Sequence, residues 1–103
     1  MGLSTRRILQ ASIAGVTTVT AIVAAPAAGR IVVTDIFLSL DSAGEILFES
    51  AGDNLTGLME LADSTPLVAS SEHGVLHCAA EEALNLTSTT AANGWIRYFI
   101  EAP

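Results

Sequence analysis

One stretch, residues 29–50, constrains the fold of this chain more than any other. It reads GRIVVTDIFLSLDSAGEILFES: Ile, Val, Thr, Phe and Leu dominate from Arg30 to Leu40, a polar Asp-Ser-Ala-Gly segment interrupts them, and a second apolar run begins at Ile46. β-Branched and aromatic residues fit the half-buried surface of a pleated strand. The stretch therefore predicts two strands, 30–40 and 46–50, paired as an antiparallel hairpin.

Alternation along the strands predicts which side chains form the core, because successive residues of a strand point to opposite faces. The expected core residues are Val32, Ile36, Leu38, Leu40, Phe48, Leu86, Tyr98 and Ile100. Large apolar side chains also lie on the opposite face of strand 30–40 and on the opposite face of the last predicted strand, residues 95–101. This pattern indicates either a central strand covered by loops or an interface with another molecule. The interface is our main interpretation, with the oligomer contacts Ile31, Val33, Phe37, Trp95 and Phe99.

The rest of the chain predicts one all-β domain. With 103 residues, the chain has material for a single core. Short apolar runs separated by turn signals predict about eight strands, and the Asn93-Gly94 pair is typical of a hairpin turn. We expect a single-domain antiparallel β-sandwich of jelly-roll type over residues 16–103, preceded by an N-terminal arm over residues 1–15.

Charge is distributed unevenly along the chain. There are 11 acidic residues against four arginines and no lysine, which gives a formal net charge of −7. Nucleic acid is not expected as a partner, because phosphate binding depends on clustered Lys and Arg. Arg6 and Arg7 precede Ile8 and Leu9, and predict an arm that attaches by charge and then buries an apolar anchor on a neighbour. No membrane contact is expected, since no stretch approaches the ~20 mainly apolar residues of a spanning helix.

Candidate chemical groups are few. His73, His77, Cys78, Glu81 and Glu82 are residue types that bind zinc, yet their spacing matches no closed zinc site, and His77 and Cys78 should point to opposite faces of a strand. Exposed or interface histidines beside a buried cysteine are the alternative that we favour. The chain has no nucleophile elbow, phosphate loop or dinucleotide fingerprint. We therefore expect no metal, no cofactor and no catalysis.

The first 28 residues permit a different interpretation of the whole chain. An arginine pair, an apolar middle and the small residues 24–28 imitate a secretory signal peptide. The chain would then be an exported bacterial β-sandwich binding module from which residues 1–28 are cleaved. Polar residues interrupt the apolar middle, which weakens this alternative: Gln10, Ser12, Thr17, Thr18 and Thr20.

An ordered set of segments over residues 16–101 resembles small β-sandwich structural proteins of tailed bacteriophages. The segments are AGRIVVTD at 28–35, Leu38-Ser39, Ala43-Gly44, Phe48, LTG at 55–57, Leu61-Ala62, EALNLT at 82–87 and the closing aromatic strand. The resemblance implies a virion component on the capsid surface, a capsid decoration or cement protein or the base of a head fibre. It also implies binding to the major capsid protein or neighbouring virion proteins without catalysis, and a symmetric homo-oligomer, for which we expect a trimer. The arm lies outside the resemblance, and its expected capsid contacts are Arg6, Arg7, Ile8 and Leu9.

Overall fold

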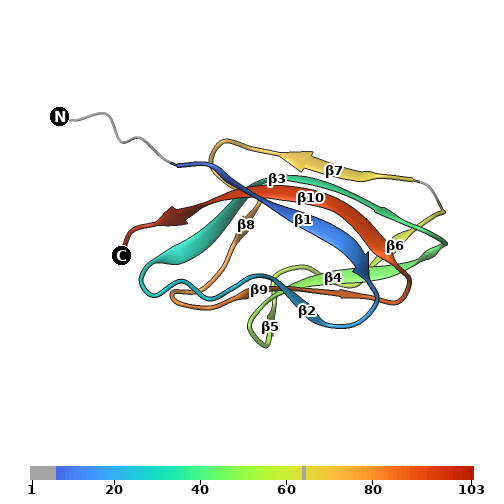
Figure 1. Cartoon of the computed structure of the whole chain (residues 1–103), viewed down its shortest axis with the longest axis horizontal. Coiled ribbons are helices and arrows are strands. Elements are labelled where there is room, and N and C mark those ends of the chain that lie inside the picture. Colours follow the sequence, from blue (N-terminus) through green and yellow to red (C-terminus); the bar gives the residue numbers. More distant parts are fainter. Residues whose placement is uncertain (1–6, 64) are drawn as a thin grey trace.

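A computed structural model describes residues 7–63 and 65–103, which form two antiparallel sheets packed face to face (Figure 1). Sheet A has the order β1 (Leu9–Val16), β10 (Ala92–Glu101), β3 (Arg30–Leu40) and β7 (Leu67–Ser70), and β8 (Leu76–His77) also pairs with β3. Sheet B has the order β2 (Thr20–Val23), β9 (Leu84–Ser88), β4 (Gly44–Ser50) and β5 (Asp53–Asn54), and β6 (Met59–Leu61) also pairs with β4. The predicted all-β sandwich is confirmed, with ten strands instead of about eight and no helix among the described residues.

The chain follows the path of a long hairpin that has been rolled up. β1 pairs with β10, β2 with β9, β3 with β7 and β8, and β4 with β5 and β6, so pairing proceeds from both ends towards the middle. Two more pairings, β10 with β3 and β9 with β4, join these pairs into two sheets. This is the connectivity of a jelly roll.

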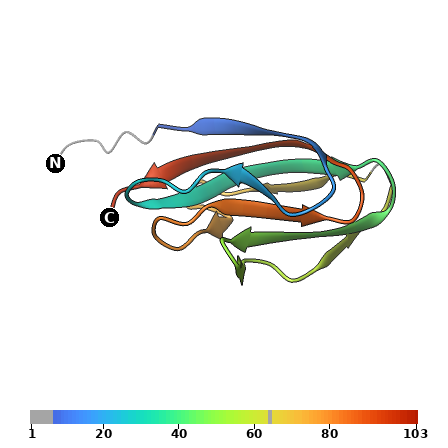
Figure 2. The same cartoon turned by 60° about the horizontal axis from the view of Figure 1, so that its bottom comes forward.

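β3 and β4 are both present, but the predicted hairpin between them is wrong. β3 lies inside sheet A and β4 inside sheet B, and Figure 2 shows β4 beside β9 in the lower layer. Leu38 on β3 and Phe48 on β4 are both fully buried, so the two apolar faces meet across the core. Alternation identifies inward-facing residues, but it does not distinguish two strands that lie side by side from two that face each other.

A β-bulge in β3 changes which of its residues face the core. Arg97 pairs with Asp35 and Tyr98 pairs with Val33, so Thr34 is an extra residue on β3. The alternation reverses at such a position. Ile31 and Val33 therefore belong to the central cluster, while Val32 is buried on the outer side of sheet A, beside Phe99.

The core between the sheets consists mainly of branched apolar side chains. Its buried members are Ile13, Val16, Val23, Ile31, Val33, Ile36, Leu38, Leu40, Ile46, Phe48, Leu76, Cys78, Leu84, Leu86, Ala92 and Ile96. Three of the eight predicted core residues differ: Val32 is buried on the outer side of sheet A, Tyr98 is half-buried against the core, and Ile100 is 38% exposed. Ile100 lies one residue before the end of β10, at the rim of the sandwich.

β1 occupies much of the predicted arm, so the prediction of an arm over residues 1–15 is wrong from Leu9 onward. β1 pairs with β10 from Leu9 to Val16, and Ile13 is only 3% exposed. Small and polar residues alternate with Leu9, Ala11 and Ile13, which is the pattern of an edge strand with one buried face.

The Asn93-Gly94 pair lies inside β10 and does not form the predicted turn. Gly94 has a φ of 148°, and a Cβ atom there would lie 1.9 Å from the carbonyl oxygen of Phe37 on β3. Only glycine permits such a close approach of two strands. The chain passes from β9 to β10 at residues 89–91 instead.

Candidate binding surface

The outer face of sheet A is the candidate functional surface. Cross-strand pairing places Ser12, Trp95, Phe37 and Val68 in one line across β1, β10, β3 and β7. Phe37 is 40% exposed, Val68 is 63% exposed, and Trp95 is half-buried. We call Trp95, Phe37 and Val68 the apolar row. A solvated sheet face normally carries polar side chains at these positions, so the row is a candidate interface.

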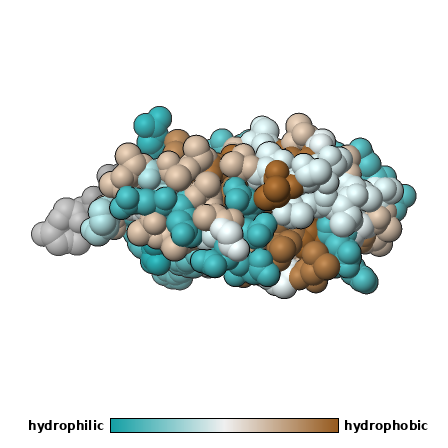
Figure 3. Space-filling model, turned by 90° about the horizontal axis from the view of Figure 1, so that it is seen from below, coloured by the Kyte–Doolittle hydropathy of each residue, from teal (hydrophilic) through white to brown (hydrophobic). Residues whose placement is uncertain are grey.

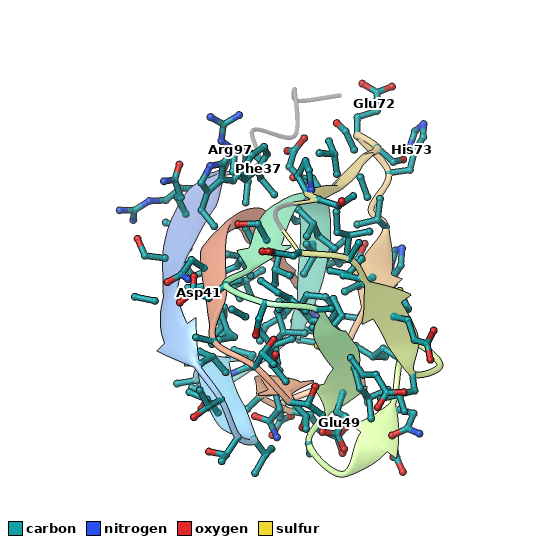
Figure 4. All side chains as sticks on the ribbon, turned by 90° about the vertical axis from the view of Figure 1, so that its right-hand side faces the viewer. Phe37, Asp41, Glu49, Glu72, His73 and Arg97 are labelled. Atoms are coloured by element: carbon teal, nitrogen blue, oxygen red, sulfur yellow. The ribbon has the colours of Figure 1, made fainter. Side chains whose placement is uncertain are left out.

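Trp95 contacts both an aromatic ring and a cation. The ring centroids of Phe37 and Trp95 are 5.9 Å apart with an interplanar angle of 13°, and Arg97 Cζ lies 4.8 Å from the Trp95 ring centroid. Figure 4 shows Phe37 and Arg97 together on the outer side of sheet A. Offset stacking and the cation–π contact are both favourable, and together they restrict the orientation of the indole.

A polar row runs beside the apolar row. Gln10, Arg97, Asp35 and Ser70 pair across the same four strands. Asp35 Oδ1 accepts a hydrogen bond from Ser70 Oγ at 2.6 Å, and Asp35 Oδ2 accepts one from Thr34 Oγ1 at 2.9 Å. The hydrogen bonds from Ser70 and Thr34, and then the charge of Arg97, lower the pKa of Asp35 below its ordinary value, because they stabilise the carboxylate.

A shallow pocket of about 290 Å³ opens at the polar row. Its lining combines Asp35, Arg97 and Ser70 with Ile8 and Glu72. Figure 4 shows Glu72 and His73 on the loop that follows β7, on the same side of the molecule as Phe37. A partner bound on the apolar row would therefore have a site for a polar side chain beside it.

The five predicted oligomer contacts divide into two groups. Ile31 and Val33 are fully buried in the core, because the bulge at Thr34 turns them inward. Phe99 is only 6% exposed and pairs with the buried Val32, so its side chain is not available to a partner either. Phe37 and Trp95 remain on the surface. The expected homotrimer stays a prediction, with its named contacts reduced to these two residues.

Sequence reasoning missed Val68 as part of this surface. Val68 becomes a neighbour of Phe37 through the β3–β7 register, which joins segments about thirty residues apart. Alternation within a single strand carries no signal for such cross-strand neighbours.

The four residues predicted as arm contacts do not all lie in an arm. Arg6 lies outside the described residues, whereas Arg7 is exposed and Ile8 is 47% exposed at the pocket. Leu9 is the first residue of β1 and pairs with Tyr98, so it belongs to the sandwich rather than to an arm. Capsid binding by Arg6, Arg7 and Ile8 stays a prediction.

The residues weighed as zinc ligands do not converge. In residues 7–63 and 65–103, no group of three or more His, Cys, Asp and Glu side chains is placed to hold a metal ion. His77 is exposed on β8, while Cys78 is buried in the core, as their neighbouring positions in the chain predict. Burial raises the pKa of the Cys78 thiol, which keeps it protonated.

The side of sheet B also exposes hydrophobic side chains. Figure 3 views this side, where a few strongly hydrophobic groups lie among residues of intermediate and hydrophilic character. Within the described part of the chain, no helix is long and apolar enough to cross a membrane.

Comparison with protein-family models, curated proteins and solved structures finds no match. The sequence resemblance, the fold and the outer face of sheet A are therefore the basis for proposing a function.

Proposed function

We propose that this chain is a bacteriophage virion structural protein, of the capsid decoration or cement kind or the base of a head fibre. In this role it binds the major capsid protein or a neighbouring virion protein on the capsid surface and stabilises the shell without catalysis. The contact is made by the outer face of sheet A. The virion context comes from the sequence resemblance, and the location of the contact comes from the arrangement of side chains on this face.

The apolar row is the observation that carries the proposal. Trp95, Phe37 and Val68 lie side by side across three strands, with Arg97 against the indole. Trp and Arg are among the residue types that contribute most to protein–protein binding energy. The row is flanked by the polar residues Asp35, Ser70 and Gln10, which gives an apolar centre with a polar rim on at least one side.

Rigidity of the row supports binding rather than simple exposure of apolar groups. The stacked Phe37 and Trp95 rings rest on a β-sheet, and Asp35 beside them is fixed by two hydrogen bonds. A surface that is already ordered loses little conformational entropy when a partner binds. The same face carries the pocket with Ile8 in its wall, so the residues just before β1 lie where they can extend the contact.

The test is reconstitution of purified protein on capsids that lack it. Trp95→Ala should weaken binding by about 2 kcal/mol or more, which corresponds to a loss of affinity of about thirtyfold, because a central aromatic anchor is removed. Phe37→Ala should weaken binding in the same direction, since it removes the stacking partner of Trp95. Occupancy of the capsids is measured by quantitative gel analysis and by cryo-electron microscopy.

Leu58→Ser is the matched control, because Leu58 is 59% exposed outside sheet A. This variant should occupy capsids as the wild type does. Full occupancy by a folded Trp95→Ala variant would contradict the proposed contact. No occupancy by the wild-type protein on any virion component would contradict the virion role itself.

The alternative of an exported module requires removal of residues 1–28. That cleavage would delete β1 and β2, which form one edge of each sheet and contribute the buried residues Ile13, Val16 and Val23. The virion proposal keeps both strands in the domain. Mass spectrometry of the amino terminus of the native protein distinguishes the two interpretations.

A further inference from the structure

β1 is the longest edge strand among the described residues, and it is unprotected by charge, proline or a bulge from Leu9 to Ile13. It has eight residues, whereas the other edge strands β2, β5, β6, β7 and β8 have two to four. An edge strand presents unpaired backbone N–H and C=O groups, and proteins normally protect such edges by short length, charge or proline. The β1 sequence LQASIAGV contains no charged residue and no proline. Its register with β10 is regular from Leu9 to Ile13 and shifts only after Ile13.

The distribution of charge favours this edge for an approach between two copies of the chain. None of the 11 acidic residues precedes Asp35, so β1 and β2 carry no negative charge. On the opposite edges, Asp53 lies on β5, Glu60 lies on β6 and Glu72 follows β7. Two chains with a net charge of −7 repel each other where acidic edges meet, whereas the β1 edge adds no such repulsion.

β1 is also complementary to itself in an antiparallel arrangement. Leu9, Ala11 and Ile13 are partly or fully buried, whereas Gln10 and Ser12 are exposed on the outer face. A two-fold axis perpendicular to the sheet places the same face of each copy on the same side. The apolar side chains of one copy then lie beside the apolar side chains of the other. The polar side chains of Gln10 and Ser12 likewise lie beside the polar side chains of the second copy. The two copies of Arg7 lie at opposite ends of the ladder, because the strands run in opposite directions.

We propose that β1 pairs with β1 of a second copy of this chain, so that the two A sheets form one continuous antiparallel sheet across a two-fold axis. The pairing satisfies the free backbone groups of both edges. It also places two apolar rows on one continuous face. This inference does not depend on the virion role, and its dimer differs from the trimer that the sequence resemblance implies.

The first test is the mass of the full-length protein by sedimentation velocity and light scattering across the micromolar range. A dimer is expected, and either a monomer at high micromolar concentration or a trimer would overturn the proposal. The double variant Gln10→Lys/Ser12→Lys then tests the location of the contact. It places lysines on the outer face of β1, where like charges meet across the axis, and should weaken the dimer about tenfold. Added salt should restore part of the affinity by screening this repulsion.

The matched control adds the same charge at the far edge of sheet B, by Asn54→Lys/Leu58→Lys. Asn54 is exposed on the edge strand β5, and Leu58 is 59% exposed. The Asn54→Lys/Leu58→Lys variant should remain a dimer, with circular dichroism showing that both variants are folded. Loss of the dimer in the control, or an unchanged dimer in Gln10→Lys/Ser12→Lys, would overturn the assignment to β1.

Amide hydrogen exchange of the wild type gives a readout that needs no variant. The β1 amides that do not bond to β10 should exchange more slowly as the protein concentration rises, since the dimer pairs them. Exchange of β1 that does not depend on concentration would contradict the proposal even if the lysine variant fails to fold.

Discussion

Ile13→Ala tests whether β1 is an integral part of the folded domain. Ile13 is 3% exposed and packs in the core between the two sheets. The substitution removes three carbon atoms, for which a transfer free energy of about 0.8 kcal/mol per buried CH₂ gives about 2.4 kcal/mol. The cavity that remains increases this cost, so we expect the free energy of unfolding to fall by about 2.5–4 kcal/mol. For a domain of this size, the melting temperature should fall by about 10 °C or more.

The assay is urea unfolding followed by Trp95 fluorescence, at one fixed protein concentration because self-association would make the midpoint depend on concentration. Val19→Ala is the control from the same segment, since Val19 is 61% exposed and its truncation should change the stability by no more than about 0.5 kcal/mol. If Ile13→Ala is as stable as Val19→Ala, then β1 does not pack on the core. The interpretation of residues 1–28 as a dispensable leader would then gain support.

Two further predictions concern the strand contact at Gly94 and the carboxylate in the polar row. Gly94→Ala should destabilise the protein by about 2 kcal/mol or more in the same urea assay, because its Cβ would clash with the Phe37 carbonyl oxygen. Gly52→Ala is the control and should destabilise the protein far less, since no atom lies within 4 Å of the added Cβ. Equal losses of stability in the two variants would refute the close approach of β10 and β3. The lowered pKa of Asp35 means that its carboxylate contributes stability that is present above its ordinary value of 3.8 and is lost as the pH falls through the folded value below it. Asp35→Asn should therefore lose less stability between pH 5 and pH 2 than the wild type, and identical acid profiles would contradict the hydrogen-bonding that we describe.

Several features of the fold were predictable from local patterns. The strand at 30–40 has the predicted bounds, because a long run of β-branched residues between a glycine and a polar turn favours no other structure. Alternation also predicted the burial of Leu38, Leu40, Phe48 and Leu86. The choice of a β-sandwich followed from many short strands without a helical period.

The edge strand β1 was harder to recognise. Its residues are small or polar at every second position, and only Ile13 and Val16 become fully buried. Such a segment has too little apolar surface to form a strand alone. Its conformation depends on the β10 edge with which it pairs, and residues 92–101 lie about eighty positions away.

The sequence by itself determined that this chain is all-β, that its core is built from branched apolar side chains, and that Phe37 and Trp95 are too large and apolar for an ordinary surface strand. These properties are local, because they depend on residue type and on the period of a strand. Only the tertiary structure decided that β3 and β4 lie in different sheets and that an extra residue at Thr34 turns Ile31 and Val33 into the core. It also decided that Val68 joins the aromatic pair, since strand partners and bulges arise from contacts between segments far apart in the chain, and no local period encodes them.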